Sequence, residues 1–175
     1  MAANWTAFVS GDVLTAAQLN DVVDNFQDIA IFNETQASNT QGGTFTSGSY
    51  VKRTLNTTVV NNITGCSIAS SVITLPAGTY IAFGYAPALG VNSHKTRLQN
   101  TTAGTTIGLG QNSFSNSSPL SQTASIVNRT FTLTVTSTIE LQHRAESTFA
   151  TNGLGAICNF GDSEIYAQIQ ITRIA

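Results

Sequence analysis

Hydrophobic and polar residues alternate along most of the chain beyond about residue 50, which is the pattern of strands with one buried face. These alternating runs occur at 50–60, 67–75, 79–86, 91–99, 104–110, 122–136, 138–146 and 164–174. In the run at 130–135, we expect Phe131, Leu133 and Val135 to face a core and the threonines between them to face solvent. About eight short strands with no helical pattern between them predict a mainly β protein, with a jelly-roll sandwich head over residues 50–175.

The helical pattern of the chain lies in residues 1–34, which we interpret as a separate attachment segment. Apolar residues recur there at spacings of three and four, at Leu19, Val22, Val23, Phe26 and Ile29. Thr15 and Gln18 have the spacing of a capping box, in which each side chain bonds the backbone amide of the other residue. The pattern predicts a short amphipathic helix of about 15–17 residues. Such a helix is marginal alone and must pack on the head, on its own copies or on a partner. We expect Trp5 and Phe8, which precede it, to dock into a partner or a neighbouring subunit.

Residues 35–49 separate the predicted helix from the predicted strands. They are polar and include Gly42-Gly43 and Ser47-Gly48-Ser49. Such a composition is typical of a flexible linker. We therefore divide the chain into an attachment segment at 1–34, a linker at 35–49 and a head at 50–175.

Charged side chains are sparse and unevenly distributed. They make up 9% of the 175 residues, and the formal net charge is −2. Residues 1–34 hold five of the nine acids and none of the seven bases. The bases of the remaining chain are spread along the sequence rather than clustered, so we do not expect nucleic-acid binding.

The sequence indicates neither a secretory signal nor a membrane span. The N-terminus lacks a basic start followed by an apolar core, and no apolar run approaches the length needed to cross a membrane. We therefore expect synthesis in the cytoplasm, release by lysis and no membrane insertion.

Cys66 and Cys158 are the two cysteines of the chain and lie far apart in it. No Cys or His spacing suggests a zinc site. A disulfide between them is an alternative, but two free thiols are favoured, because one pair does not define a disulfide scaffold.

His94 and His143 lie in predicted strands near several charged residues. Strand alternation puts Glu140 and Arg144 on one face, where Arg97 from another strand could join them, and puts His143 on the opposite face. These five residues are candidates for a polar cluster or a metal site. The favoured interpretation is that hydrogen-bonded interface histidines and an ion pair occur here.

No arrangement of catalytic residues is apparent, so we expect neither enzymatic activity nor a cofactor. Ser, Thr and His occur without a nucleophile motif. The acids of the head, namely Glu140, Glu146, Asp162 and Glu164, give no clear pair for glycoside cleavage. We expect Asp162 and Glu164 to be solvated.

Two polar loops each carry one aromatic ring, Phe114 near 111–120 and Phe149 near 147–155. A ring among amides and hydroxyls could cover the apolar face of a sugar, and the alternative is that each ring anchors its loop to the head. The candidate receptor-binding residues are Phe114, Asn112, Asn116, Phe149 and Asn152.

Several segments resemble parts of known virion proteins. LPAGTYIAFGYA, VNSHKTRLQN, TLTVTSTIELQHRAE and NGLGAICNFG resemble the globular heads at the tips of phage fibres. Those heads are similar to the tumour-necrosis-factor/complement-type jelly roll. FVSGDVLTAAQLNDVVDNF resembles the attachment segment of phage tail fibres and other virion appendages.

The resemblance implies a homotrimer, in which the helices pack as a short bundle and the last strand lies between the core and a subunit interface. On a three-fold axis a ring of three imidazoles would suit zinc or nickel, as an alternative to interface histidines. The implied function is that of a virion structural protein, a short tail fibre exposed on the particle. Its N-terminus would join a baseplate, tail or capsid protein, and its head would bind a glycan or protein of the host surface. A capsid decoration or head-fibre protein with a mechanical or weakly adhesive role is the alternative.

Overall fold

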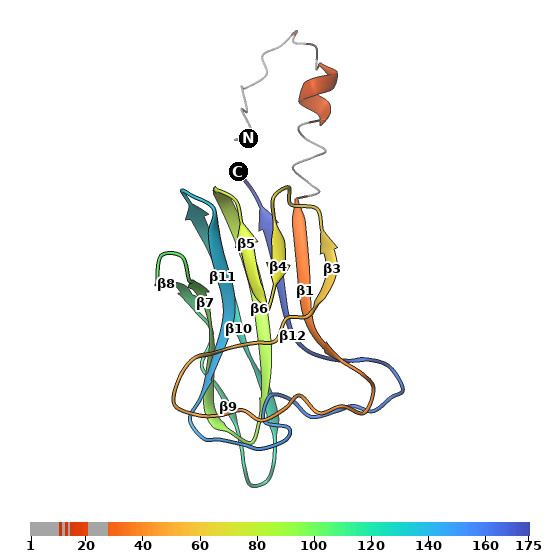
Figure 1. Cartoon of the computed structure of the whole chain (residues 1–175), viewed down its shortest axis with the longest axis vertical. Coiled ribbons are helices and arrows are strands. Elements are labelled where there is room, and N and C mark those ends of the chain that lie inside the picture. The colour runs from red at the N-terminus through yellow and green to blue at the C-terminus, as the bar shows by residue number, and fades with distance from the viewer. Residues whose placement is uncertain (1–10, 12, 14, 21–27) are drawn as a thin grey trace.

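Strands account for nearly all regular structure in this computed structural model, which describes residues 11, 13, 15–20 and 28–175. The strands are β1 (Ile29–Gln36), β2 (Val51–Lys52), β3 (Thr57–Asn61), β4 (Ser67–Ala69), β5 (Val72–Leu75), β6 (Gly78–Leu89), β7 (Asn92–Asn100), β8 (Thr105–Leu109), β9 (Ser113–Ser115), β10 (Gln122–Leu133), β11 (Ser137–Ala145) and β12 (Glu164–Arg173). A five-stranded antiparallel sheet has the order β10-β6-β12-β1-β3. A seven-stranded antiparallel sheet has the order β4-β5-β11-β7-β8, with β2 paired to β11 and β9 to β7. The two sheets pack as a jelly-roll sandwich (Figure 1), which confirms the predicted fold class.

The core lies between the two sheets and is filled by the inward residues of the alternating strands. Tyr80 of β6, Leu141 of β11 and Ile169 of β12 are all 0% exposed. At the end of β10, Leu133 is buried as predicted. Val135 was expected in the core but is 59% exposed, because β10 ends at Leu133 and the alternation stops with it.

In β12, the alternation of buried and exposed side chains is interrupted near the start of the strand. Continuous alternation would bury Ile165, but Ile165 is 53% exposed and Tyr166 is buried in its place. The pairing with β1 advances two residues from Asn33 to Thr35 but three residues along β12, so β12 holds one extra residue as a β-bulge. The bulge turns Tyr166 inward, where its hydroxyl donates to the carbonyl of Thr40 at 2.6 Å.

The predicted capping box is present. The backbone N–H of Thr15 donates to Gln18 Oε1 at 2.9 Å, and that of Gln18 donates to Thr15 Oγ1 at 3.3 Å. Residues 16–20 form a helical turn, on which Leu19 is 54% exposed. Trp5, Phe8, Val22, Val23 and Phe26 lie outside the described residues. Among those that are described, no helix has the length and apolar character to cross a membrane.

The predicted helix does not extend to Ile29, which begins β1. A short apolar run such as Ile29–Phe32 fits a strand as well as a helical turn, because it has no period of its own. In β1, Ala30 and Phe32 point into the core and are 0% exposed, whereas Ile29 and Ile31 lie half-buried on the outer side. The prediction of an attachment segment up to residue 34 is therefore wrong, and the head begins with β1.

The segment predicted as a flexible linker is part of the head. The backbone N–H of Gly42 donates to the carbonyl of Gly155 at 3.0 Å, and Phe45 and Phe149 exchange two backbone bonds of 3.0 Å. The Phe45 side chain is 0% exposed. A Cβ on Gly42 would meet the backbone of Gly155 at 2.9 Å, so glycine serves close packing here rather than flexibility.

The chain enters the head at one end, and the turn between β6 and β7 lies at the other. The backbone N–H of Arg173 donates to the carbonyl of Asp28 at 2.9 Å, and that of Thr79 donates to Ala175 at 2.6 Å. The start of β1, the start of β6 and the end of β12 therefore lie together. β6 runs for 12 residues, a rise of about 40 Å, before β7 turns back at Asn92. Figure 1 shows the C-terminus and the start of β1 at the top and β9 at the bottom.

Candidate functional site

A pocket of about 730 Å³ opens at the far end of the head, at the start of β7 and the end of β11. Its lining includes Tyr50, Lys95, Asn112, Phe114, Arg144 and Glu146. Two of the predicted receptor-binding residues, Asn112 and Phe114, therefore lie in one concave site.

Strand register places the side chains of this pocket. Arg144 of β11 is paired with Lys95 of β7, and Phe114 of β9 is paired with Ser93 of β7. Residues paired in this way project to the same face of a sheet. The Phe114 ring is 54% exposed. Glu146 Oε2 accepts the backbone N–H of Ser93 at 3.1 Å, and hydrogen bonding to Ser93 lowers the pKa of the Glu146 carboxyl.

A polar chain crosses the same sheet face beside the pocket. The Arg97 guanidinium carbon lies 4.1 Å from the centre of the Tyr50 ring, and Arg97 Nε donates to Gln142 Oε1 at 2.7 Å. Gln142 Nε2 in turn donates to Glu140 Oε2 at 2.6 Å, and Lys52 Nζ lies 3.8 Å from Glu140 Oε1. The predicted grouping of Arg97 with Glu140 therefore exists, and Gln142 joins the two.

The fold gathers bases that are spread out in the sequence. Four of the seven, Lys52, Lys95, Arg97 and Arg144, project from the outer face of the seven-stranded sheet. The interpretation of the bases as scattered is therefore wrong for this face, because cross-strand pairing of β2, β7 and β11 joins distant parts of the chain.

His94 and His143 face inward from β7 and β11, and His94 also lines the pocket. His94 Nδ1 lies 2.9 Å from His143 Nε2, and His94 Nε2 lies 2.8 Å from Thr123 Oγ1. The Thr123 hydroxyl donates to the carbonyl of Phe114 at 3.1 Å. These contacts are satisfied together when His143 Nε2–H donates to His94 and His94 Nε2–H donates to Thr123. A hydrogen-bond chain then runs from the buried His143 to the backbone of the pocket residue Phe114.

Both imidazoles are held neutral at pH 7. Burial, together with the nearby Arg53 guanidinium, lowers the pKa of His94 to about 4 and that of His143 well below its usual value. The histidines face inward while Arg97, Glu140 and Arg144 face outward, so the predicted cluster divides between two faces of the sheet. In the part of the chain that the structure describes, no three His, Cys, Asp or Glu side chains are grouped to hold a metal ion.

The other predicted receptor-binding residues do not share this pocket. Phe149 is half-buried and packs on a second small core with Phe45 and Val91, so the expectation of an exposed ring is wrong and the anchoring alternative is right. Asn152 is half-buried in the same loop. Asn116 is exposed in the loop after β9, outside the pocket lining.

Glu164, expected to be solvated, is 6% exposed and holds two loops together. Its carboxylate accepts the backbone N–H groups of Cys158 at 3.0 Å, Asn159 at 2.9 Å and Asn39 at 3.4 Å. These bonds, that of Cys158 first, lower the pKa of the Glu164 carboxyl. Glu164 therefore holds the loop before β12 against the segment 35–49.

Cys66 and Cys158 are free thiols, as favoured from the sequence. Cys158 is exposed and Cys66 is half-buried. Burial raises the pKa of the Cys66 thiol to about 11, so this thiol is protonated and unreactive at neutral pH.

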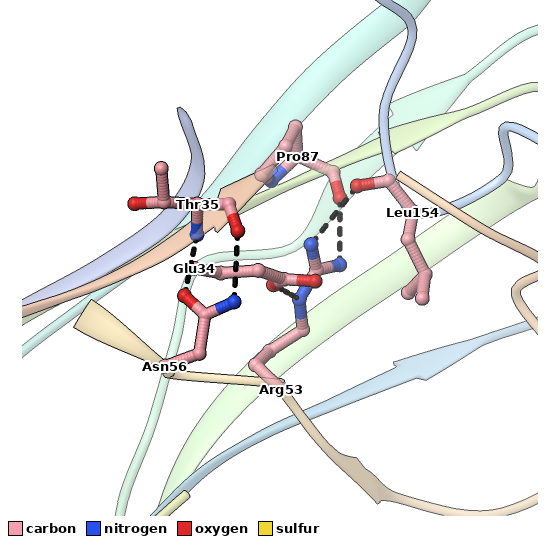
Figure 2. A network of polar contacts seen from close by, with 6 residues as sticks. All are labelled: Glu34, Thr35, Arg53, Asn56, Pro87 and Leu154. Carbon is pink, nitrogen blue, oxygen red and sulfur yellow. Dashed lines mark hydrogen bonds and ion pairs between the residues drawn. The ribbon is translucent and has the colours of Figure 1, made fainter. Parts of the chain in front are cut away.

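A buried ion pair between Glu34 of β1 and Arg53, which follows β2, was not predicted from the sequence. Arg53 Nε donates to Glu34 Oε2 at 2.7 Å, and both side chains are at most 2% exposed. The other guanidinium nitrogens donate to the carbonyls of Pro87 at 3.2 Å and Leu154 at 2.9 Å. Figure 2 shows Arg53 reaching all three partners, with Asn56 bonded to the backbone of β1 alongside. The network ties β1, β6 and the 149–155 loop to the segment after β2.

The alternation of the sequence contains a signal for this pair. Val51, Arg53 and Leu55 occupy alternate positions, so Arg53 is in phase with apolar residues. A base at such a position needs a buried acid, because an unpaired buried charge is costly. Glu34 is in phase with Ala30 and Phe32 in the same way, but assigning it to the attachment segment hid the match.

Comparison with known proteins shows the fold. The globular domain of zebrafish complement 1qA protein matches with a TM-score of 0.52 and 15% identity, over 84% of this chain and 95% of that chain. Eiger TNF from S. frugiperda matches with a TM-score of 0.56 and 12% identity, over 84% and 92%. PRD1 vertex protein P5 matches with a TM-score of 0.50 and 12% identity, over 85% and 98%. No protein-family model and no curated protein sequence matches the chain. The head thus shares its jelly-roll fold with these three structures.

Proposed function

We propose that the chain is a virion structural protein that forms a homotrimer, is exposed on the particle and contacts the host cell surface through the far end of its head. The position of the pocket carries the proposal. Asp28, where the chain enters the head, and the pocket lie at opposite ends of β6. A head held through its N-terminal segment by a baseplate, tail or capsid protein would present Phe114 and its neighbours outward. This role is one of binding and needs no catalytic group or cofactor.

The outer face of the five-stranded sheet supports trimer formation. Ile81 and Phe83 of β6 are 41% and 40% exposed, and Tyr85 follows half-buried on the same face. Gln168 and Gln170 of β12 pair with Tyr85 and Phe83. An apolar and aromatic strip bordered by amides has the composition of a subunit interface. The resemblance of the head to trimeric fibre heads supports three copies.

A capsid decoration or head-fibre protein is the second candidate. The fold likeness to PRD1 vertex protein P5 favours this candidate, since that protein is named a vertex protein. The same head and the same trimer would serve either role. Location on the particle separates them.

Three measurements test the proposal with the full-length chain. Light scattering should give about three times the chain mass of 18.4 kDa. Soluble protein added in excess should compete with the particle for host cells and reduce adsorption. Immunogold labelling of the particle should decorate the tail for a tail fibre or the capsid for a decoration protein. A monomer that leaves adsorption unchanged would contradict the proposal.

A further inference from the structure

Two of the four bases on the outer face of the seven-stranded sheet have no acid partner within the described part of the chain. Lys52 lies near Glu140, and Arg97 is held by Gln142 and the Tyr50 ring. By contrast, no acid among the described residues lies within 4.0 Å of the side-chain nitrogens of Lys95 or Arg144. Both of these residues line the pocket, and they are paired directly across β7 and β11.

The formal charge of the pocket matches a single anionic group. Lys95, Arg144 and Glu146 are its ionised side chains, since His94 in its lining is neutral at pH 7. The sum is one positive charge. An arginine beside a lysine suits a carboxylate, which the planar guanidinium can bond through two parallel hydrogen bonds.

The remaining lining suits the rest of a sugar. The exposed ring of Phe114 offers an apolar surface at one wall. Asn112 contributes an amide that can both donate and accept. Glu146 is oriented by the bond from Ser93 to its Oε2, which leaves Oε1 to accept hydroxyl groups. The cavity of about 730 Å³ lies within the usual range for small-ligand sites.

We propose that this pocket binds a saccharide that bears a carboxylate. The inference deepens the proposed surface-binding function and rests on it. The carboxylate lies between Lys95 and Arg144, and the apolar face of the sugar ring covers Phe114. Sugar hydroxyls pair with Asn112 and Glu146.

A saccharide fits this site better than an acidic peptide does. Peptides dock by adding a strand to an open sheet edge, by filling an apolar groove or, where they carry phosphate or acidic motifs, on a cluster of arginines. Among the described residues, the lining of this pocket holds a single arginine, Arg144. The paired cations Lys95 and Arg144 instead project from β7 and β11, which hydrogen-bond to each other within the sheet. Small polar groups beside the exposed Phe114 ring suit hydroxyl-rich ligands.

The first test compares ligands that differ only in charge. Full-length protein is titrated with methyl glucuronide and with the matching neutral glucuronamide, followed by saturation-transfer NMR. The carboxylate should bind about tenfold more tightly at low salt, and the advantage should shrink as salt rises. N-acetylneuraminic acid, tested in parallel, distinguishes a sialic acid from a uronic acid as the source of the carboxylate. Equal binding of glucuronide and glucuronamide, or equal binding of glucose 6-sulfate, would overturn the inference.

The second test uses variants matched in charge. Lys95→Gln and Arg144→Gln should each lower glucuronide affinity about five- to tenfold, toward that of the amide. Lys52→Gln removes the same charge from the same face outside the pocket and should leave affinity unchanged. Phe114→Ala should weaken glucuronide and glucuronamide alike. Equal affinities of the Lys95, Arg144 and Lys52 variants would overturn the inference.

Host adsorption separates failure of this inference from failure of the proposed function. If the protein blocks adsorption but does not prefer the carboxylate sugar, the proposed function is supported and the inference about the pocket is contradicted. If the protein binds the carboxylate sugar through Lys95 but does not compete for host cells, the binding site is supported and the proposed function is contradicted. Tighter binding of an Asp- and Glu-rich peptide than of either acidic sugar would assign the pocket to a protein receptor and overturn the inference.

Discussion

His94 and His143 form a hydrogen-bonded pair of neutral imidazoles inside the head, with Nδ1 of the first 2.9 Å from Nε2 of the second. They are 3% and 0% exposed. The charged group that acts on both is the guanidinium of Arg53, which lowers the pKa of each ring and is itself paired with Glu34. A proton added to either ring would therefore place a second cation in a buried site.

The pair predicts acid lability between about pH 6.5 and pH 4. In the unfolded chain a histidine titrates near pH 6.5, whereas burial lowers the pKa of His94 to about 4. Across this interval the unfolded state binds more protons, so the free energy of unfolding falls as the pH falls. The Glu164 carboxyl, whose pKa is lowered by its backbone hydrogen bonds, adds its own loss of stability as the pH falls through the range in which an unfolded glutamate titrates and below it.

Urea unfolding of the wild type and of a His94→Gln/His143→Gln variant measures this effect. The double variant should lose most of the pH dependence between about pH 7 and pH 4.5, whatever its stability at neutral pH. Parallel curves for the two proteins would show that the imidazoles do not control acid stability.

The Glu34–Arg53 pair predicts a strong asymmetry between single and double substitutions. Arg53→Met should lower the free energy of unfolding by about 3–5 kcal/mol, because it leaves the carboxylate of Glu34 buried without its partner. It also frees the carbonyls of Pro87 and Leu154 from their donor. Chemical denaturation measures the change.

The double variant Glu34→Met/Arg53→Met is the control for this prediction. Replacing both charges with apolar side chains of similar length removes the unpaired charge, so most of the lost stability should return. A double variant that is as unstable as Arg53→Met alone would show that the bonds to the two carbonyls, rather than the ion pair, carry the stability.

The alternation within single strands was enough to predict the sandwich. How the strands pair with one another could not be predicted from it. Leu133, Leu141 and Ile169 could be assigned to the core, because the apolar residues of an alternating strand mark its buried face. The bulge at Tyr166 could not be predicted, since it depends on the register with β1. Ile29 was misassigned to the helix, because the apolar run Ile29–Phe32 fits either structure.

The site was predictable only where its residues lie close in the sequence. Asn112 and Phe114 could be named from one polar loop. Lys95 and Arg144 could not be joined to them as a pocket, because their proximity arises from cross-strand pairing of β7 with β11. The basic face therefore emerges only from the fold.

Phe83→Asp should convert the proposed trimer into a monomer of about 18.4 kDa. Phe83 lies 40% exposed on the outer face of the five-stranded sheet, and burial of an unpaired carboxylate in an interface there would be costly. Val135→Asp is the matched control, because Val135 is 59% exposed beyond the end of β10. Light scattering reads out both variants. A Phe83→Asp variant that remains trimeric would show that the subunit interface lies on another face.

Deleting residues 1–27 should leave a folded head, whereas deleting residues 1–40 should not. β1 lies between β12 and β3 in the five-stranded sheet, so its loss would leave β12 without its neighbour on one side and detach β3. The longer deletion also removes Phe32, which is 0% exposed in the core, and Glu34, which would leave Arg53 buried and unpaired. Thermal unfolding followed by circular dichroism should show a cooperative transition for the shorter deletion, within a few degrees of the full-length chain, and none for the longer. A cooperative transition in protein that starts at residue 41 would show that the sandwich closes without β1 and would restore the boundary near residue 50.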